Sequence, residues 1–224
     1  MSSGILTADI TQGPFPVAPN AAQNERTRLI NDALSSDAWS SQCIEEQRLV
    51  TVQQPLLFQV CMIENIGRPK AGQLDVLRSR IDPRTQRVDR VSTSTDRHLV
   101  TAVDVDTDAP VDLQSQGTGR STFKLTLQDK TGAMYFAINM SPLNFLKNDG
   151  SSCVLGSKLV VLPGTIFSRG VFLLRDSTVT FMGGMIQTWN RGRDQKMCAY
   201  LEAHLEASDR VETGPSRKRK NPAT

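Results

Sequence analysis

The residue types that most often perform catalysis are few in this chain and lie far apart. Only two of the 224 residues are histidines, His98 and His204, and neither belongs to a cysteine or serine motif of known mechanism. Gly117-Thr118-Gly119 resembles part of a glycine-rich loop, but no lysine follows it, so it does not form a phosphate-binding site. The sequence therefore predicts a protein that is not an enzyme.

The cysteines do not indicate a metal site. No two of them have the short spacing that a zinc site requires. We expect reduced thiols, no structural metal and no cofactor. The four residues are Cys43, Cys61, Cys153 and Cys198.

The overall charge is too mild for a chain dominated by DNA binding. The net charge is +3 and the isoelectric point is about 8.8. At 38% hydrophobic residues the chain can form one ordinary globular domain with tails. No apolar run approaches the roughly 20 residues that span a bilayer. The start lacks a basic region followed by an apolar stretch. We expect a soluble, intracellular protein without a membrane partner.

Charge is unevenly distributed in the middle of the chain. The stretch from Arg68 to Arg97 contains eight basic and four acidic residues, whereas the stretch from Val100 to Gly119 contains four aspartates and no lysine or arginine. A long surface loop is thermodynamically cheap, so this segment could be a tolerated insertion. Its length and its division into a basic and an acidic half favour a functional loop.

Short apolar runs on both sides of this segment have the pattern of strands. Thr122 to Asp129 alternates strictly, with Phe123, Leu125 and Leu127 on one face, which is typical of a half-buried strand. Asp129-Lys130-Thr131-Gly132 has the composition of a tight hairpin turn. The other expected strands are Leu56 to Ile63, Ala133 to Ile138, Ser157 to Leu162, Gly170 to Leu174 and Thr178 to Met182.

The order of these runs predicts an OB-fold: a long strand, a hairpin, a short helical bridge around Pro142 to Leu146, and a closing pair of strands. The fold class is thus an all-β core, a five-stranded barrel, with flanking α-helices and a long insertion between strands 1 and 2. We expect a flexible leader at 1–20, a short helical segment at 21–54, the OB-fold domain at 55–207 with insertion 67–121 and C-terminal helix 193–207, and a basic disordered tail at 208–224.

Helices are expected at Ala21 to Leu34, Ser40 to Val50 and Ala71 to Arg80, and a further strand at Leu99 to Val105. The first two helices could form a lid on the barrel or the remnant of a helical domain. The C-terminal helix could pack on the barrel, contact a partner, or do both.

Four segments resemble the OB-fold domain of the RecQ-mediated genome instability protein 1 family in order and spacing. They are Phe123 to Gly132, Leu155 to Val161, Phe167 to Leu174 and Val179 to Gly184. The Met182-Gly183-Gly184 exit that precedes a helix is the most specific of these signals. The resemblance covers roughly Leu56 to Ala207.

The resemblance implies a non-catalytic subunit that binds a type IA topoisomerase, topoisomerase III, and through it a RecQ-family helicase. The family's complex dissolves double Holliday junctions, and the barrel insertion reaches toward the topoisomerase gate. Larger relatives carry a helical domain before the barrel and a second OB-fold after it. This chain departs from them on both counts, with a short polar leader and an end soon after the first barrel, so we expect it to resemble the compact fungal members.

Candidate partner-binding residues lie on the barrel and in the insertion. On the barrel, Lys158 and Arg169 occupy polar positions in the matching motifs. In the insertion the candidates are Arg78, Arg80, Arg84, Arg87, Leu99 and Val100.

The alternative is a stand-alone OB-fold protein that binds single-stranded DNA. Such proteins combine a basic groove with aromatic residues on which bases stack. Here the candidates for weak DNA contact are Lys124, Lys130 and Tyr135, with Arg169 beside them. Tyr135 is expected to be exposed, opposite Phe136, but one aromatic residue does not make a stacking platform.

A compact basic cluster near the C-terminus fits nuclear import or phosphate contact. It consists of Arg217, Lys218, Arg219 and Lys220. We therefore expect the protein in the nucleus, with DNA contacted weakly or through the complex.

Overall fold

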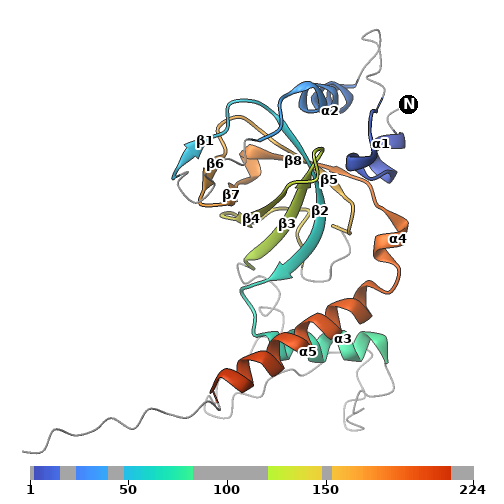
Figure 1. The fold of residues 1–224 in the computed structure, drawn as a ribbon, viewed down its shortest axis with the longest axis vertical. Helices are drawn as coiled ribbons and strands as arrows, with labels where there is room; N and C mark the ends of the chain where they lie inside the picture. Colours follow the sequence, from blue (N-terminus) through green and yellow to red (C-terminus); the bar gives the residue numbers. More distant parts are fainter. Residues whose placement is uncertain (1–2, 16–23, 40–47, 83–120, 148–152, 213–224) are drawn as a thin grey trace, which may run out of the picture. The chain divides into compact units, whose positions relative to one another are not determined.

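The computed structural model describes residues 3–15, 24–39, 48–82, 121–147 and 153–212 (Figure 1). They belong to two compact units. The barrel unit comprises Met1–Gly67 and Leu113–Arg191, and the helix-pair unit comprises Arg68–Asp112 and Gly192–Thr224. The predicted insertion thus begins in one unit and contributes a helix to the other.

The barrel unit is built on one curled sheet. β2 (Leu56–Asn65), β3 (Phe123–Asp129) and β4 (Met134–Asn139) form an antiparallel meander. On its other side, β4 pairs in parallel with β7 (Val171–Leu174). β2 pairs on its other side with β5 (Lys158–Val161). The remaining strands are β1 (Val50–Thr51), β6 (Ile166–Ser168) and β8 (Val179–Gly183). The order is β1-β6-β7-β4-β3-β2-β5-β8.

This topology confirms the predicted OB-fold and explains why eight strands replace the expected five. β5 and β6 are successive parts of one long strand that is interrupted around Pro163-Gly164, and β7 and β8 are successive parts of the next, interrupted by the 3₁₀ turn η4 (Asp176–Thr178). Both halves keep the same antiparallel partner, since β5 pairs with β8 and β6 with β7. The short β1, which the sequence pattern did not predict, adds the eighth strand along β6.

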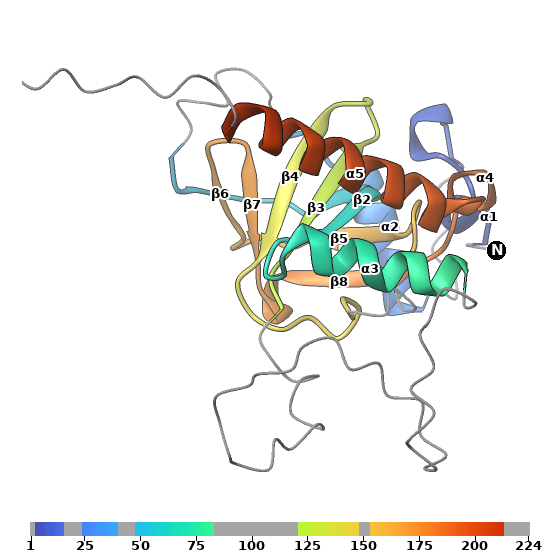
Figure 2. The same cartoon turned by 90° about the horizontal axis from the view of Figure 1, so that it is seen from below.

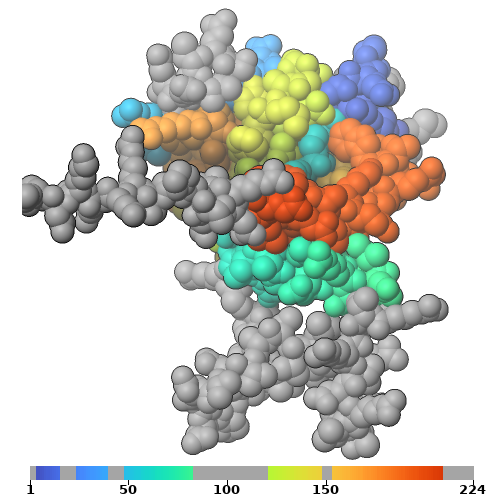
Figure 3. All heavy atoms as spheres, turned by 60° about the horizontal axis from the view of Figure 1, so that its bottom comes forward, coloured from blue at the N-terminus to red at the C-terminus, as the bar shows by residue number. Residues whose placement is uncertain are grey.

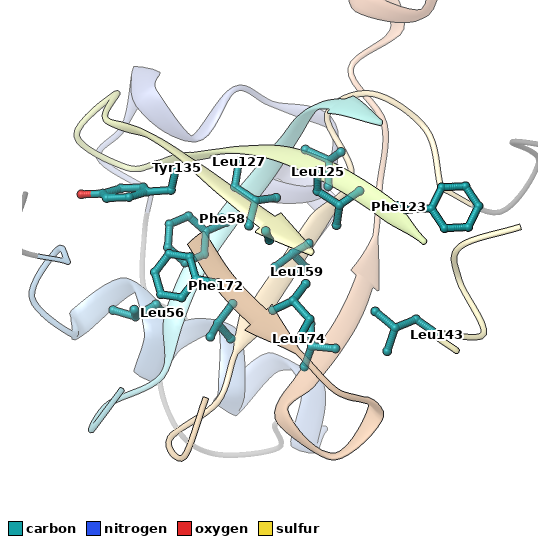
Figure 4. Packing of buried hydrophobic residues seen from close by; sticks show 14 of the residues in the cluster. Leu56, Phe58, Phe123, Leu125, Leu127, Tyr135, Leu143, Leu159, Phe172 and Leu174 are labelled. Atoms are coloured by element: carbon teal, nitrogen blue, oxygen red, sulfur yellow. The ribbon is translucent and has the colours of Figure 1, made fainter. Parts of the chain in front are cut away.

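The interior of the barrel is filled by the alternating faces of these strands. Phe123, Leu125 and Leu127 of β3 are buried, as their period of two predicted. Phe58, Tyr135 and Phe172 meet at one end of the core, with ring centroids 5.3–5.8 Å apart (Figure 4). Burying one such side chain contributes about 1.5–3 kcal/mol, so this cluster is a principal source of the barrel's stability.

Side-chain hydrogen bonds fix the turn that joins β3 to β4. Oδ1 of Asp129 accepts hydrogen bonds from the backbone N–H groups of Thr131 and Ala133 and from the Thr131 hydroxyl. Gly132 then adopts a φ of +89°, which a residue with a side chain rarely does. The predicted hairpin is present for the reason that its sequence indicated.

The N-terminal residues differ from the expected flexible leader. α1 (Ser3–Thr7) and the 3₁₀ turn η1 (Ile10–Gln12) bury Ile5 and Ile10 in a small core with Leu57 and Val160 of the sheet. The segment is held by bonds to residues distant in sequence: Gln59 Oε1 accepts from the Ile10 N–H, and Leu6 O accepts from the Met185 N–H. Because these contacts are non-local, no periodicity within residues 3–15 predicts them.

Of two other elements predicted near the barrel, the helix before it is present and the helical bridge is not. α2 (Glu25–Ser35) corresponds to the helix expected at Ala21 to Leu34, and it buries Ile30 and Ala33 in the same small core. The helical bridge expected around Pro142 to Leu146 is wrong, because this stretch forms turns. It still closes the barrel end, since Leu143, Phe145 and Leu146 are buried in the main core.

The helix-pair unit consists of α3 (Lys70–Ile81) and α5 (Arg193–Glu212), which lie side by side (Figures 2 and 3). Leu74 of α3 and Cys198 and Leu201 of α5 form its buried centre. Both helices were predicted, but not their pairing, because neither amphipathic pattern identifies its partner. A four-residue helix, α4 (Gln187–Asn190), ends the barrel unit before α5.

Candidate partner-binding site

The insertion leaves and re-enters the barrel at one point, which we call the insertion root (residues 65–67 and 121–123). The backbone N–H groups of Ile66 and Gly67 both donate to Thr122 O, at 2.8 and 3.2 Å. Oδ1 of Asn65 accepts from the Gly67 N–H at 2.9 Å. The two strands of the chain are therefore fixed next to each other where the insertion begins and ends.

Asn139 at the end of β4 completes the root. Its Oδ1 accepts a 2.6 Å hydrogen bond from the Phe123 N–H, and its Nδ2 donates to Ser121 O at 3.2 Å and to Ser141 O at 3.0 Å. This side chain is buried, so the amide group replaces water for three backbone groups. The root is thus a rigid base for whatever the insertion contacts.

Two of the predicted insertion residues are engaged within the helix-pair unit. Nη2 of Arg78 lies 2.7 Å from Oε1 of Glu202, and Nη1 of Arg80 lies 3.7 Å from Oδ2 of Asp194. The Glu202 hydrogen bond raises the pKa of the Arg78 guanidinium above its ordinary value, aided by the charges of Glu202 and Asp75. Both arginine side chains are about half exposed, so such pairs contribute little to stability.

The other predicted residues of the insertion and tail lie outside the described residues. They are Arg84, Arg87, Leu99, Val100, Arg217, Lys218, Arg219 and Lys220. The same holds for the helix expected at Ser40 to Val50 over residues 40–47 and for the strand expected at Leu99 to Val105.

Lys158 does not lie on the barrel surface, so the expectation that it forms a surface contact is wrong. Its side chain is 0% exposed, and Nζ donates a 2.6 Å hydrogen bond to Gly156 O. The period of two holds in β5, since Leu159 and Val161 belong to the main core and Val160 belongs to the small core beneath the N-terminal segment. Lys158 lies opposite Gln59, which binds Asp9 and Ile10, so the N-terminal segment covers this outer face and buries Lys158.

Burial dominates the electrostatics of Lys158 and its neighbours. Desolvation lowers the pKa of Lys158 from 10.5 to about 8, although the charges of Asp9 and Cys61 act to raise it. Burial, with the charge of Asp9, raises the pKa of Cys61 to about 11. Burial would also raise the pKa of Asp9, but hydrogen bonds from Thr11 and Gln59, together with the Lys158 charge, leave it below its ordinary value.

Gln59 joins this buried group to the N-terminal segment. Its Nε2 donates to Asp9 Oδ1 at 2.7 Å and to Gln128 Oε1 at 2.9 Å, while its Oε1 accepts from the Ile10 N–H at 3.1 Å. The polar groups between β2, β3 and η1 therefore satisfy one another. They have the features of a structural clamp and not of a catalytic site.

Tyr135 is buried, so the expectation of an exposed stacking residue is wrong. It is 2% exposed, and its hydroxyl donates to Trp39 O at 2.9 Å. Burial, with the Asp129 charge, raises the pKa of this phenol. Since β4 places adjacent residues on opposite faces, Phe136 is the exposed aromatic residue, at 44%. The core accepts tyrosine because a backbone carbonyl is within reach of its hydroxyl.

The cationic candidates for DNA contact are largely committed to other groups. Nζ of Lys130 donates to Leu34 O and Ser36 O at the C-terminal end of α2, where a helix dipole favours a positive charge. Nζ of Lys124 lies 3.2 Å from Glu64 Oε2 and 4.4 Å from the centroid of the Phe136 ring. Both ammonium groups therefore have structural partners already.

Arg169 is exposed at the two-residue turn between β6 and β7. It has a φ of +48° and is followed by Gly170 at +86°, and two positive φ values in succession are what a type I′ hairpin turn requires. A non-glycine residue in this conformation costs about 1–2 kcal/mol. Among the barrel candidates, Arg169 alone presents an exposed charged side chain, since Lys124 and Lys130 are half-buried and Lys158 is buried.

The sequence prediction missed the exposed apolar side chains of the β4 segment. Met134, Phe136 and Met140 are 50%, 44% and 57% exposed. A signal was available, because Met134 to Ile138 is apolar at every position and a strand with one wet face should alternate. Contact with solvent alone does not account for apolar residues on the outer face of this strand.

Two kinds of site find no support among the described residues. Histidine, cysteine and carboxylate side chains do not gather there in groups of three or more that could hold a metal ion. Within the same ranges, each helix is too short or too polar to span a bilayer.

Comparisons with known proteins identify one family model and two relatives that each match most of the chain. The model of the family described as "RMI1, N-terminal OB-fold domain" matches residues 36–197. RecQ-mediated genome instability protein 1 of Saccharomyces cerevisiae is 39% identical over 240 aligned residues, which cover 97% of this chain and 98% of the relative. The protein of the same name from Schizosaccharomyces pombe is 23% identical over 166 residues, or 72% of this chain and 69% of the relative.

Proposed function

Because this chain belongs to the RecQ-mediated genome instability protein 1 family, we propose that it is a non-catalytic subunit that binds topoisomerase III. With a RecQ-family helicase, the complex would promote decatenation and the dissolution of double Holliday junctions. The observation that carries this proposal is the 39% identity over almost the full length of both chains. The shortage of candidate catalytic residues in the sequence agrees with a scaffold role in genome stability.

In this proposal the barrel is the docking module and the insertion acts on the enzyme. The insertion root fixes both ends of residues 67–121 on the barrel, and the pairing of α3 with α5 gives the first part of the insertion a defined structure. The remaining part of the insertion contacts the topoisomerase near its DNA gate and stabilises the open gate. A binding partner can shift an open-to-closed equilibrium only by binding one state more tightly, so this contact must favour the open state.

The charge pattern of the insertion supports this role. Its basic half carries Arg84 and Arg87, and its acidic half follows after Leu99 and Val100. The basic half of the insertion can attract a DNA strand, and its acidic half can attract basic groups of a protein. We also propose that the cluster from Arg217 to Lys220 directs the protein to the nucleus, where such a complex would act.

The alternative, a stand-alone single-strand DNA-binding protein, receives little support from the described residues. Tyr135 is buried, Lys130 binds the end of α2, and Lys124 is paired with Glu64. A stacking platform requires exposed aromatic faces beside free cations.

Replacement of residues 84–117 by a Gly/Ser segment of equal length tests the role of the insertion. This variant retains α3 and the insertion root, so we expect the fold and the complex with topoisomerase III to persist. We expect most of the stimulation of decatenation to be lost, as measured with purified proteins and catenated DNA circles. A matched control replaces residues 213–224 in the same way and should stimulate like the natural chain. Full stimulation by the insertion variant would contradict the gate mechanism.

A further inference from the structure

The outer face of the sheet carries a continuous apolar surface, which we call the outer patch. Its members point away from the core on β4 and β7 and on the residue after β4. The register places Phe136 opposite Val171 and Ile138 opposite Leu173, so the two rows are in contact. The outer patch consists of Met134, Phe136, Ile138, Met140, Val171 and Leu173.

Exposure on this scale indicates a binding surface. Met134, Phe136 and Met140 are each about half exposed, and Ile138, Val171 and Leu173 are half-buried between them. Single exposed apolar residues are common on proteins, but a contiguous group usually marks an interaction site. Methionine side chains are flexible and polarisable, which suits them to contact with a protein surface.

The outer patch is continuous with the insertion root. Asn139, between Ile138 and Met140, forms the hydrogen bonds to Ser121 and Phe123 that hold the root. At the other side of the root, Ile66 is 50% exposed. A partner that contacts the insertion where it leaves the barrel would therefore meet the outer patch next.

The charged groups at the ends of β7 indicate what the partner presents. Arg169 precedes this strand and Arg175 follows it, and both side chains are exposed. Neither forms a salt bridge with another described residue. A complementary surface has apolar side chains at its centre and carboxylates at its rim, opposite these two arginines.

The same surface is poorly suited to single-stranded DNA. The Lys124 ammonium covers one face of the Phe136 ring, so a base could stack there only by displacing it. That ammonium is also paired with Glu64, whose carboxylate repels phosphates. The rest of the outer patch is aliphatic or thioether, which favours a protein partner over a nucleic acid.

We infer that the outer patch is the face by which the barrel docks on topoisomerase III, with Phe136 and the two flanking methionines as its apolar centre. This inference rests on the proposed function, because that function supplies the partner. The outer patch would then provide affinity for the topoisomerase, while the effect on the gate remains the proposed role of the insertion.

The test measures the affinity of the full chain for purified topoisomerase III. In the variant Met134→Ser/Met140→Ser, two exposed thioethers are lost without a cavity in the core, so the fold should persist. We expect the Kd to rise at least about ten-fold, as for residues at the centre of an interface. Met185→Ser is the matched control, since Met185 is 43% exposed and lies outside the outer patch, and it should leave the Kd unchanged.

A second variant tests the chemistry of the partner. Arg169→Glu should weaken binding and reduce the dependence of the Kd on salt concentration, because it removes a charge that faces carboxylates. An unchanged salt dependence would overturn the charge assignment at the rim.

The outcomes separate the two proposals. Equal binding by the natural chain and the double methionine variant would overturn the outer patch as the docking face and leave the proposed function intact. An absence of binding by the natural chain would overturn both. A loss of affinity for a single-stranded oligonucleotide, with unchanged affinity for the topoisomerase, would assign the surface to DNA and overturn the inference.

Discussion

Lys158 is a polar strand residue that the N-terminal segment buries on the outer face of the barrel. Its amino group is buried beside Gly156 O, with Asp9 and Cys61 as the ionisable groups nearby. Removal of an ammonium group from water is costly, and a single neutral carbonyl compensates only part of that cost. The residue therefore lowers stability at neutral pH compared with an apolar residue of similar size.

We predict that Lys158→Met raises the free energy of unfolding at pH 7 by about 1–3 kcal/mol, since one pKa unit corresponds to about 1.36 kcal/mol. On folding, the pKa of Lys158 falls from 10.5 to about 8. Between these values the unfolded chain holds a proton that the folded chain lacks, so the stability of the natural chain rises with pH. The difference in the free energy of unfolding between the Lys158→Met variant and the natural chain should therefore become smaller as the pH rises from about 8 to about 10.5.

Urea denaturation over this pH range, with Cys61→Ala in both proteins, provides the measurement. The thiol must be removed because its raised pKa of about 11 acts in the opposite direction above pH 9. A destabilised Lys158→Met variant at pH 7 would show that the ammonium group has a stabilising partner.

Among the secondary-structure elements, α1 packs on the barrel through a close backbone contact between Leu6 and Gly184. Gly184 has a φ of +91°, and a Cβ at this position would overlap Leu6 O. The neighbouring Met185 N–H donates to the same carbonyl at 2.9 Å. The glycine is therefore needed both for its conformation and for its lack of a side chain.

Gly184→Ala and Gly164→Ala form a matched pair that isolates this contact. Gly164 has a φ of +92° with no atom near the position of a Cβ, so Gly164→Ala should cost only the conformational term of about 1–2 kcal/mol. Gly184→Ala should cost at least about 1 kcal/mol more, because the alanine displaces α1. Thermal unfolding measures the costs, and limited proteolysis at residues 3–15 measures the displacement. If both variants lost the same free energy of unfolding and residues 3–15 were equally protected from proteolysis in both, α1 would not be packed against Gly184.

The elements that could be predicted are those whose signal is local. The alternation of Phe123, Leu125 and Leu127 and the Asp129 turn identify the β3–β4 hairpin directly. The docking of Ile5 and Ile10 could not be predicted in this way, because their partners Leu57 and Val160 lie far away in the sequence. For the same reason the pairing of α3 with α5 had no signal in either helix alone.

The candidate site was harder to predict than the fold. Alternation correctly placed Lys158 on the outer face, but the N-terminal segment covers that face and buries the residue. Tyr135 was expected on the exposed face, but it lies opposite the buried Leu127, and its hydroxyl donates to Trp39 O. Arg169 kept its expected exposure because a hairpin turn has no interior face. The exposed methionines of the outer patch were overlooked because methionine usually indicates a core.

At the scale of the whole molecule, the chain combines a barrel with an insertion that serves two purposes. The first part of the insertion supplies α3, which pairs with α5 in a separate unit, and the rest is the segment proposed to act on the gate. The insertion root fixes both ends of the insertion on the barrel, which also carries the outer patch. In the proposed function, this arrangement would let a small subunit regulate a larger enzyme.

We propose that this chain binds topoisomerase III and increases its decatenation activity. The most direct test is co-purification of the two proteins, followed by a decatenation assay of the enzyme with and without the chain. We expect a stable complex that decatenates DNA faster than the enzyme alone. The absence of a complex, together with submicromolar binding of single-stranded DNA by the chain alone, would contradict it.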